Sequence, residues 1–474
     1  MVLLEKTSVK RHYIGVFALT LLITGAIDSI RNLPTTALFG SSLFFFFTLS
    51  ALIFLCPVGL VAAELSSTFS DEEGGVFSWI KHAFGQNWAF FTVWLQWINT
   101  MVWYPTILSF IAGTLAYLIA PNLANNKLYL ITVIIIVFWA LTFLALRGLR
   151  ASSFFAGLCA ILGMIVPVGF IIGLAGYWCY LKNPLAIDLS LSNIVPTWDH
   201  SQSFGSLTAI ITSFLGMELA AVHVRQIKNP QRNFPKAIFF SIVLILVTML
   251  LGSLAIAIVL PKNEINLVDG VMQAFTNFLA TYNLKFLIPI TAVLLLLGSL
   301  GGMINWIISP AKGLLMAAGH GYLPRKFYKL NKHGMASNIL LTQAIMVTFL
   351  CAGFLLFTKI NAIYWLFTAL STELYLLMYV MMFLAAIKLK RTHGHLASDF
   401  KIPGGRIGLN IVAVTGLIGC FVTLVVGFIP PEQTIDLGGD NYFRIIFALG
   451  LLLMISPVLF FMHRAAPHRT EPRP

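Results

Sequence analysis

The sequence has very little charge. Only 10% of its 474 residues are Asp, Glu, Lys or Arg, whereas 58% are hydrophobic and the mean hydropathy is +0.89. A water-soluble protein carries about 25% charged residues. A chain this apolar cannot cover a surface that faces water. This excludes a soluble protein and requires lipid around much of the chain.

Cysteine is also scarce. The five cysteines lie in or at the ends of apolar stretches and show no CxxC spacing. This pattern is typical of small packing residues, so we expect no metal ligands and no cofactor. The charged start of the chain is followed by a long apolar span without a small-residue cleavage site, so we expect no removable signal peptide.

Long apolar runs are abundant. A helix needs roughly 20 apolar residues to cross the hydrocarbon core of a membrane. We count about twelve such spans, with centres near residues 24, 54, 105, 137, 166, 213, 247, 300, 347, 377, 417 and 452. They are too long and unbroken for barrel strands, which are about 10 residues of alternating pattern. The predicted fold class is all-α, a polytopic membrane protein.

The net charge of +13 is distributed unevenly between the two sides of the membrane. An even number of spans puts both termini on one side, which holds 23 Lys and Arg residues against five on the other. The positive-inside rule places that side in the cytoplasm. Topology accounts for the surplus charge, and we expect no nucleic-acid partner.

A few ionisable residues lie within the expected spans. They are Asp28, Arg31, Glu64, Glu218 and Glu373. A charge at the bilayer centre costs about 2.5–3.5 kcal/mol on insertion scales, and such residues usually face a bundle interior or a wet cavity. Glu64 stands at a helix end, where it caps the helix or reaches the interface. The other four are candidates for a functional site.

Two of these residues lie beside expected helix breaks. Thr24-Gly25-Ala26 precedes Asp28 in the first span, and Gly216 precedes Glu218 in the sixth. Interrupted segments at matching positions of two halves are typical of inverted-repeat transporters whose site lies at the breaks. The alternative is that mid-span glycines only allow close helix packing.

The motifs resemble a known family. Phe214–Ile238, with Gly and Glu at the break followed by NPxRxxPKA, resembles the helix 6–7 signature of the amino acid–polyamine–organocation transporters. Pro57–Ile80 resembles their helix 2 end and first inner loop. Leu260–Phe278 and Phe400–Gly405 are similar to the bacterial glutamate/γ-aminobutyrate antiporter branch.

This resemblance implies a five-plus-five inverted repeat with broken helices 1 and 6, alternating access, and exchange of an amino acid for its decarboxylated or related product. It implies a multi-pass protein of the bacterial inner membrane. The expected parts are a cytoplasmic N-terminus (1–12), helices 1–5 (13–181), helices 6–10 (203–392), helices 11–12 (405–463) and a short cytoplasmic tail (464–474).

The expected substrate site lies at the two breaks. Half-helix ends carry about half a charge, so a substrate carboxylate suits freed N–H groups at Thr24–Ile27 and its ammonium suits freed carbonyls near Ser213–Gly216. The predicted binding residues are Ile23, Thr24, Gly25, Ala26, Ile27, Asp28, Arg31, Ser213, Phe214, Leu215, Gly216, Glu218, Met303, Trp306 and Glu373. Trp97, Trp103 and His223 are candidates for gating or pH sensing, although belt, packing or capping roles are the alternatives.

Two departures from the glutamate/γ-aminobutyrate branch concern the substrate. Gly302 stands where that branch is expected to have a helix 8 Glu, and the stretch Leu297–Gly302 resembles the arginine/agmatine branch, which has Trp at the position of Met303. Helix 10 instead carries Glu373. A permease or exchanger for a neutral or cationic amino acid or amine is therefore the alternative to a glutamate/γ-aminobutyrate antiporter.

Several roles stay open for single residues. Asp28 and Arg31 are three apart on one helix face and form an internal ion pair, or Arg31 binds a substrate carboxylate in bidentate fashion while Asp28 or Glu373 holds it in the empty site. Glu373 is a ligand for the substrate ammonium, a proton carrier or the partner of Arg31. Glu218 orders the helix 6 break or contacts the passing ligand.

The function predicted from these residues is secondary active amino-acid transport. A membrane enzyme would need clustered catalytic groups such as HExxH or paired aspartates inside a helix, and the sequence contains none. A channel would not need a pair of broken helices. The expected partners are small amino-acid substrates and the lipid bilayer, and the sequence leaves open whether the chain forms a homo-oligomer.

Overall fold

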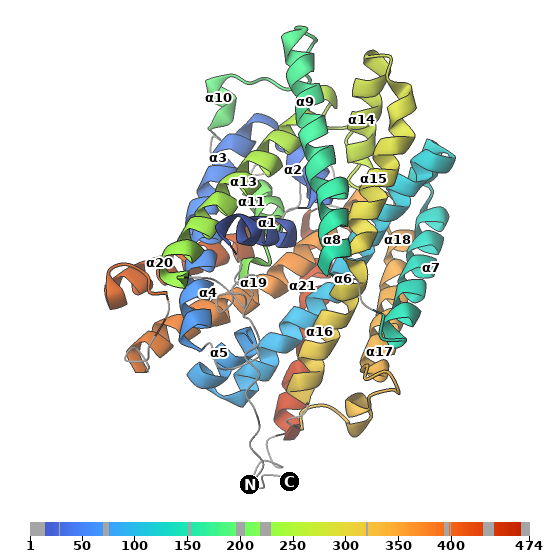
Figure 1. Cartoon of the computed structure of the whole chain (residues 1–474). Helices are drawn as coiled ribbons and strands as arrows, with labels where there is room; N and C mark the ends of the chain where they lie inside the picture. Colours follow the sequence, from blue (N-terminus) through green and yellow to red (C-terminus); the bar gives the residue numbers. More distant parts are fainter. Residues whose placement is uncertain are drawn as a thin grey trace, which may run out of the picture.

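The computed structural model describes residues 15–27, 29–69, 75–149, 153–195, 204–218, 229–318, 321–392, 398, 400–429 and 440–465. Within these ranges the regular structure is entirely helical. Ten of the helices are long and apolar enough to cross a membrane, or eleven if one bent pair counts as a span. Figure 1 shows them packed as a single helical bundle. The all-α membrane fold predicted from the sequence is confirmed.

The helices are numbered as in Figure 1. They are α1 (Val16–Ile27), α2 (Leu33–Ala37), α3 (Leu43–Ser50), α4 (Cys56–Thr68), α5 (Val76–Phe84), α6 (Gln86–Ile119), α7 (Lys127–Leu146), α8 (Ser153–Ala160), α9 (Val166–Tyr180), α10 (Leu191–Ile194), α11 (Gly205–Thr212), α13 (Pro230–Val259), α14 (Gly270–Thr281), α15 (Ile288–Gly301), α16 (Met303–Ala318), α17 (Ser337–Cys351), α18 (Gly353–Leu356), α19 (Ile360–Thr392), α20 (Gly405–Val426) and α21 (Asp440–Ala465). Five-residue π-helical segments join α3 to α4 and α8 to α9.

Eleven of the twelve expected spans are present among the described residues. They are the bent pair Val16–Gly25 with Ile30–Ala37, and then Gly40–Thr68, Gln86–Ile119, Lys127–Leu146, Gly157–Tyr180, Arg232–Val259, Lys285–Met316, Ser337–Leu356, Ile360–Thr392, Gly405–Val426 and Asn441–Arg464. The span expected near residue 213 is represented by α11 and the turn after it. Its continuation at 219–228 lies outside the described residues.

Helices α6 and α19 form the centre of the bundle. In α19, 72% of the most apolar stretch is buried inside the protein, against 17% for α21. Figure 1 shows α19 crossing the middle of the bundle, where it packs against α6, α5, α11 and α20. Side chains that project from α19 are therefore surrounded by protein, whereas α21 turns most of its surface outward.

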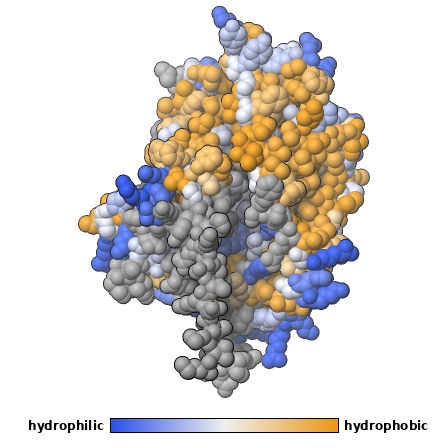
Figure 2. All heavy atoms as spheres, in the orientation of Figure 1, coloured by the Kyte–Doolittle hydropathy of each residue, from blue (hydrophilic) through white to orange (hydrophobic). Residues whose placement is uncertain are grey.

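The outer surface is adapted to lipid. Figure 2 shows hydrophobic side chains covering a broad band of the visible face, with hydrophilic side chains gathered toward its two ends. Large apolar residues such as Phe349, Leu356 and Leu453 are more than 70% exposed. Contiguous exposed apolar surface of this kind is rare on soluble proteins. The band therefore fits the hydrocarbon core of a bilayer.

The connection between α13 and α15 contains a buried carboxylate. Asp269 precedes α14 and is only 2% exposed. Its Oδ2 accepts a 2.9 Å hydrogen bond from the Tyr117 hydroxyl at the end of α6, whereas Oδ1 has no partner among the described residues. Burial raises the pKa of Asp269 to about 6, and the bond from Tyr117 opposes that rise.

This carboxylate predicts a pH-dependent stability. Because the pKa of Asp269 is raised by folding, the native state binds its proton more tightly, and the stability falls as pH rises from about 4 to about 6. Asp269→Asn keeps an acceptor for Tyr117 and removes the buried charge. We expect it to raise the free energy of unfolding at neutral pH by up to about 3 kcal/mol and to have little effect below about pH 4.

Thermal unfolding of the detergent-solubilised protein across this pH range checks the prediction. Tyr117→Phe serves as the comparison, because losing its hydrogen bond raises the pKa of Asp269 further and moves the transition to higher pH. An Asp269→Asn variant with the same pH dependence as the parent would contradict the assignment.

Candidate functional site

The first transmembrane segment breaks between α1 and the turn that begins at Ile30. Helix α1 continues through Ile27, Ser29 is extended with φ −144° and ψ 111°, and a short 3-10 turn (Ile30–Asn32) leads into α2 at a bend of 44°. The first half of the bent pair ends at Gly25 and the second half begins at Ile30, so the predicted break at Thr24–Ala26 adjoins the observed one, although α1 keeps a helical backbone through Ile27. Weak helix propensity alone does not open a helix in lipid, where no water replaces the lost hydrogen bonds. Pro34, in the first turn of α2, has no N–H to donate to the carbonyl of Ile30, and the residues before α2 form a 3-10 turn.

This position reverses the expected chemistry of Thr24–Ile27. These residues form the last turn of α1, so the segment presents free carbonyls rather than free N–H groups. The first N–H groups of the second half belong to the turn that begins at Ile30. Ile23, Thr24 and Ile27 are buried, and Gly25 is exposed, with open space where a Cβ would stand. Ala26 is helical, and the structure does not describe its side chain.

The sixth segment breaks where the sequence predicts. Helix α11 ends at Thr212, residues 213–216 form a turn, and Gly216 has φ +106°, a left-handed conformation that favours glycine. The backbone is helical again at Met217 and Glu218. Ser213 and Phe214 are buried, and Leu215 is half-buried. Gly216 is therefore the hinge of this break.

Glu218 holds the sixth-segment break against α19. Its carboxylate accepts hydrogen bonds from the hydroxyls of Tyr375, at 2.6 Å, and Tyr379. The Tyr379 hydroxyl in turn accepts the N–H of Gly216 at 2.9 Å. These contacts fix the turn at Gly216 against α19, and a contact of Glu218 with a passing ligand stays a prediction.

Arg31 lies in the second half of the broken first segment and is 4% exposed. Its Nη1 donates a 2.8 Å hydrogen bond to Thr106 of α6, and its guanidinium lies 5.1 Å from the centre of the Trp103 ring. Tyr364 of α19 lies beside it. The Arg31 Nε has no hydrogen-bond partner among the described residues. A positive group with spare donor capacity therefore stands among neutral neighbours in the part of the chain that the structure describes, which does not include Asp28.

Aromatic residues adjoin Arg31. Trp103 packs against Trp306 of α16 with ring centres 5.3 Å apart. The Tyr104 hydroxyl donates to the Trp306 carbonyl at 2.9 Å and receives a 3.3 Å bond from Gln343. The structure thus brings together Arg31, Trp103 and Trp306, three residues that the sequence selected separately.

The remaining predicted residues lie elsewhere. Met303 is fully buried one turn before Trp306. Trp97 is buried with its ring 5.1 Å from that of Trp94. Asp28 and His223 lie outside the described residues, so their predicted roles stay predictions.

Glu373 is not the partner of Arg31 in this structure. It is 1% exposed, and neither carboxylate oxygen has a hydrogen-bond partner among the described residues. Its carboxylate faces α20, where a Cβ added to Gly427 would lie 1.8 Å from Oε1. The expectation that Glu373 holds Arg31 in an empty site is therefore not met by this arrangement.

Sequence reasoning missed the neutral partners of the charged groups. Thr106, Tyr364, Tyr375 and Tyr379 were not selected, because a hydroxyl in an apolar span is unremarkable alone. The four-residue spacing of Tyr375 and Tyr379 places both on one helix face and was a usable signal.

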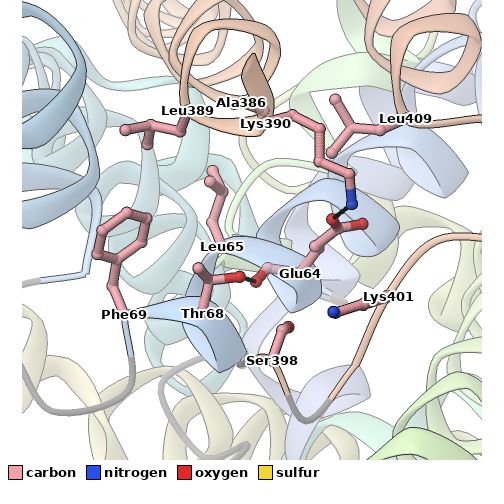
Figure 3. A pocket seen from close by; sticks show the side chains of 10 residues that line it. All are labelled: Glu64, Leu65, Thr68, Phe69, Ala386, Leu389, Lys390, Ser398, Lys401 and Leu409. Atoms are coloured by element: carbon pink, nitrogen blue, oxygen red, sulfur yellow. Dashed lines mark hydrogen bonds and ion pairs between the residues drawn. The ribbon is translucent and has the colours of Figure 1, made fainter. Parts of the chain in front are cut away.

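The pocket in Figure 3 lies where α4, α19 and the segment before α20 meet, with about 350 Å³ of empty space that includes open solvent. Glu64, 4% exposed, forms a salt bridge with Lys390 and accepts the N–H of Ile402 at 2.7 Å. Ser67 bonds to Phe400 through both the carbonyl and the N–H of that residue. Glu64 thus joins three segments rather than capping a helix.

This junction predicts an asymmetric response to mutation. Lys390→Ala leaves Glu64 charged and buried without its cation, whereas Glu64→Gln keeps an acceptor for Ile402 and leaves Lys390 near solvent. We expect Lys390→Ala to lower the free energy of unfolding by about 3 kcal/mol and Glu64→Gln by about 1 kcal/mol. Thermal unfolding in detergent measures both, with exposed Lys329→Ala as control. The reverse order would contradict the assignment.

The Glu218 contacts predict which of two tyrosine substitutions destabilises the protein more. Tyr379→Phe removes a donor to Glu218 and the acceptor of Gly216, whereas Tyr375→Phe removes one donor only. We expect Tyr379→Phe to destabilise by about 2–3 kcal/mol and Tyr375→Phe by about 1 kcal/mol. The exposed Tyr442→Phe is the matched control in the same unfolding assay. Equal losses for the two buried tyrosines would argue against a bond that orders the break.

Comparison with known proteins places this geometry in a family. A family model described as amino acid permease matches residues 14–455. An uncharacterized transporter of Legionella pneumophila is 42% identical over 456 residues, covering 95% of this chain and 97% of that protein. A glutamate/γ-aminobutyrate antiporter of Lactococcus lactis is 28% identical over 467 residues, covering 97% and 92%.

The fold has relatives among solved structures. A manganese transporter of Eremococcus coleocola, solved with an aromatic bis-isothiourea compound, superposes with a TM-score of 0.58 at 15% identity, covering 94% of each chain. At this identity the likeness concerns the fold alone. The family match spans all the segments that carry the breaks, Arg31 and Glu218. The chain belongs to the amino acid permease family of transporters.

Proposed function

We propose that this protein exchanges an acidic amino acid, glutamate in the first place, for its decarboxylated product γ-aminobutyrate. Transport follows alternating access, in which the broken segments carry the substrate past the α6–α19 core. The similarity to the antiporter of Lactococcus lactis supports this choice. The observation that carries it is Arg31, a buried cation whose Nε has no partner and whose contacts are neutral among the described residues.

The chemistry of the two substrates fits this arrangement. Glutamate and γ-aminobutyrate share one carboxylate and one ammonium, and glutamate has an additional α-carboxylate. We assign the shared carboxylate to Arg31, because a guanidinium with unused N–H groups can donate two hydrogen bonds to one carboxylate. The additional carboxylate suits the N–H groups of the turn beginning at Ile30, and the ammonium suits the carbonyls that end α1 and α11.

Exchange of cationic amines is the second candidate. A probable agmatine/putrescine antiporter of Lactococcus lactis is 26% identical over 399 residues. Gly302, between α15 and α16, stands where the glutamate/γ-aminobutyrate branch is expected to have a Glu, and the space beside it is open. A buried cation in the site disfavours a cationic ligand, since like charges at close range in a low dielectric repel strongly. Arg31 therefore favours the acidic substrate.

The same proposal includes the membrane and topology. The protein lies in a bacterial inner membrane with both termini in the cytoplasm, as the distribution of Lys and Arg favours. The chain regions 13–181 and 203–392 act as two inverted repeats, and the transport function requires no catalytic residue. The junction of Glu64 and Lys390 then lies on the cytoplasmic side.

Replacement of Arg31 by Lys tests the substrate assignment. Lysine keeps the charge and loses the bidentate fork, so we expect uptake of labelled glutamate at low concentration to fall about tenfold or more. The measurement uses proteoliposomes loaded with γ-aminobutyrate, glutamate, arginine, agmatine or nothing. The exposed Arg444→Lys is the matched control.

Two outcomes would contradict the proposal. Uptake that does not depend on an internal amino acid would exclude exchange, and arginine or agmatine as the preferred internal substrate would favour the second candidate. Asp28→Asn tests the internal ion pair. Equal losses of glutamate affinity and of thermal stability for Asp28→Asn and Arg31→Lys would indicate a self-satisfied pair instead of a carboxylate site.

A further inference from the structure

Glu373 stands apart from every contact described for the substrate. It lies in the middle of α19, one turn from the residues that tie this helix to the rest of the site. Ser371 donates to Asn99 of α6 at 3.3 Å, Thr372 and Thr212 share a 2.5 Å hydrogen bond, and Tyr375 donates to Glu218. Glu373 projects from the same turn toward α20 instead.

The surroundings of Glu373 offer no compensation for a negative charge. Neither oxygen has a hydrogen-bond partner, and no charged side chain acts on the carboxyl among the described residues of the elements packed on α19. The titratable group that faces it is the Cys420 thiol of α20. A buried, unpartnered carboxylate is very costly in the ionised form, so this packing accommodates the neutral acid.

The contact with α20 is close. Gly427 follows the last residue of α20 with φ −57° and ψ −21°, so its backbone conformation is open to any residue. A Cβ at this position would nevertheless lie 1.8 Å from Oε1 and 2.8 Å from Cδ of Glu373. The absence of a side chain at Gly427 is what leaves room for the carboxyl, and water is excluded from both oxygens.

We propose that Glu373 is a proton-binding site of this transporter, separate from the substrate site. Its protonated form fits the closed contact between α19 and α20, and its ionised form requires that contact to open to water. One O–H bond forms when the carboxylate takes a proton from water, and the same bond breaks when the proton returns to water. No other reactant takes part.

The location links the proton to the transport machinery. The turn of α19 that carries Glu373 also holds α11 through Thr372 and the sixth-segment break through Tyr375. Opening the α19–α20 contact therefore moves the helix against which the break is ordered. The inference depends on the chain being a transporter, which its family establishes, and not on which amino acid it carries.

Glu373→Gln is the direct test, because the amide has the shape of the protonated acid and cannot ionise. Exchange is measured in proteoliposomes of the full-length protein between about pH 5 and about pH 8, with exposed Glu264→Gln as the matched control. We expect the parent and the control to change rate about tenfold across this range and Glu373→Gln to change less than about twofold.

Thermal unfolding of the same variants in detergent supplies a readout that needs no substrate. We expect the difference in unfolding midpoint between the parent and Glu373→Gln to vary with pH. A Glu373 that does not exchange a proton over this pH range would give a difference that is constant with pH. If the parent does not exchange glutamate but this pH-dependent difference is present, the proposed substrate fails and the proton site stands. Identical pH profiles of the parent and Glu373→Gln in both assays would overturn the proton site.

Gly427→Ala decides the question if Glu373→Gln does not fold. The added methyl displaces the carboxyl, so we expect the midpoint of the pH profile to move by about one pH unit or more. Gly176→Ala, at an exposed helical position with open space, is the control and leaves the profile unchanged. A Gly427→Ala profile that coincides with that of the control would overturn the proton site.

Discussion

Charged side chains inside a lipid-solvated bundle need protein partners, and among the described residues α19 supplies those of Glu218 and Glu64. The low dielectric makes an unpaired polar group energetically costly and strengthens the hydrogen bonds of a paired one. Tyr375 and Tyr379 bind Glu218, and Lys390 pairs with Glu64. These contacts come from the most deeply buried stretch among the candidate spans described. One rigid helix therefore positions the sixth-segment break and the pocket beside α4.

Hydropathy was sufficient for the spans and insufficient for their breaks. The positions of the spans follow from the hydropathy of consecutive residues. Eleven of the twelve expected centres therefore fall on helices that the structure describes. The break at Gly216 was predictable because its positive φ favours glycine. The break of the first segment was predicted next to its observed place, although the backbone stays helical through Ile27, because lipid offers no substitute for the helical hydrogen bonds.

Partners across the bundle could not be derived from the sequence. Arg31 and Thr106 are 75 residues apart, and Glu218 and Tyr379 are 161 apart. Such pairs depend on how distant helices cross, which local periodicity does not encode. The positions of carboxylates and glycines in the sequence indicated which membrane spans carry charged residues. It could not indicate that Glu373 faces α20 rather than Arg31.

The separation of Arg31 from Glu373 has a consequence for selectivity. Adjacent opposite charges would form an ion pair, and a ligand would then have to displace it. The described neighbours of Arg31 are instead a threonine, a tryptophan and a tyrosine, which contribute hydroxyl oxygens and a ring face but no charge. The charge balance of this region among the described residues is incomplete without an anion. In the proposed function a substrate carboxylate supplies this anion, because the same low dielectric that makes an unpaired charge costly favours an acidic ligand beside Arg31.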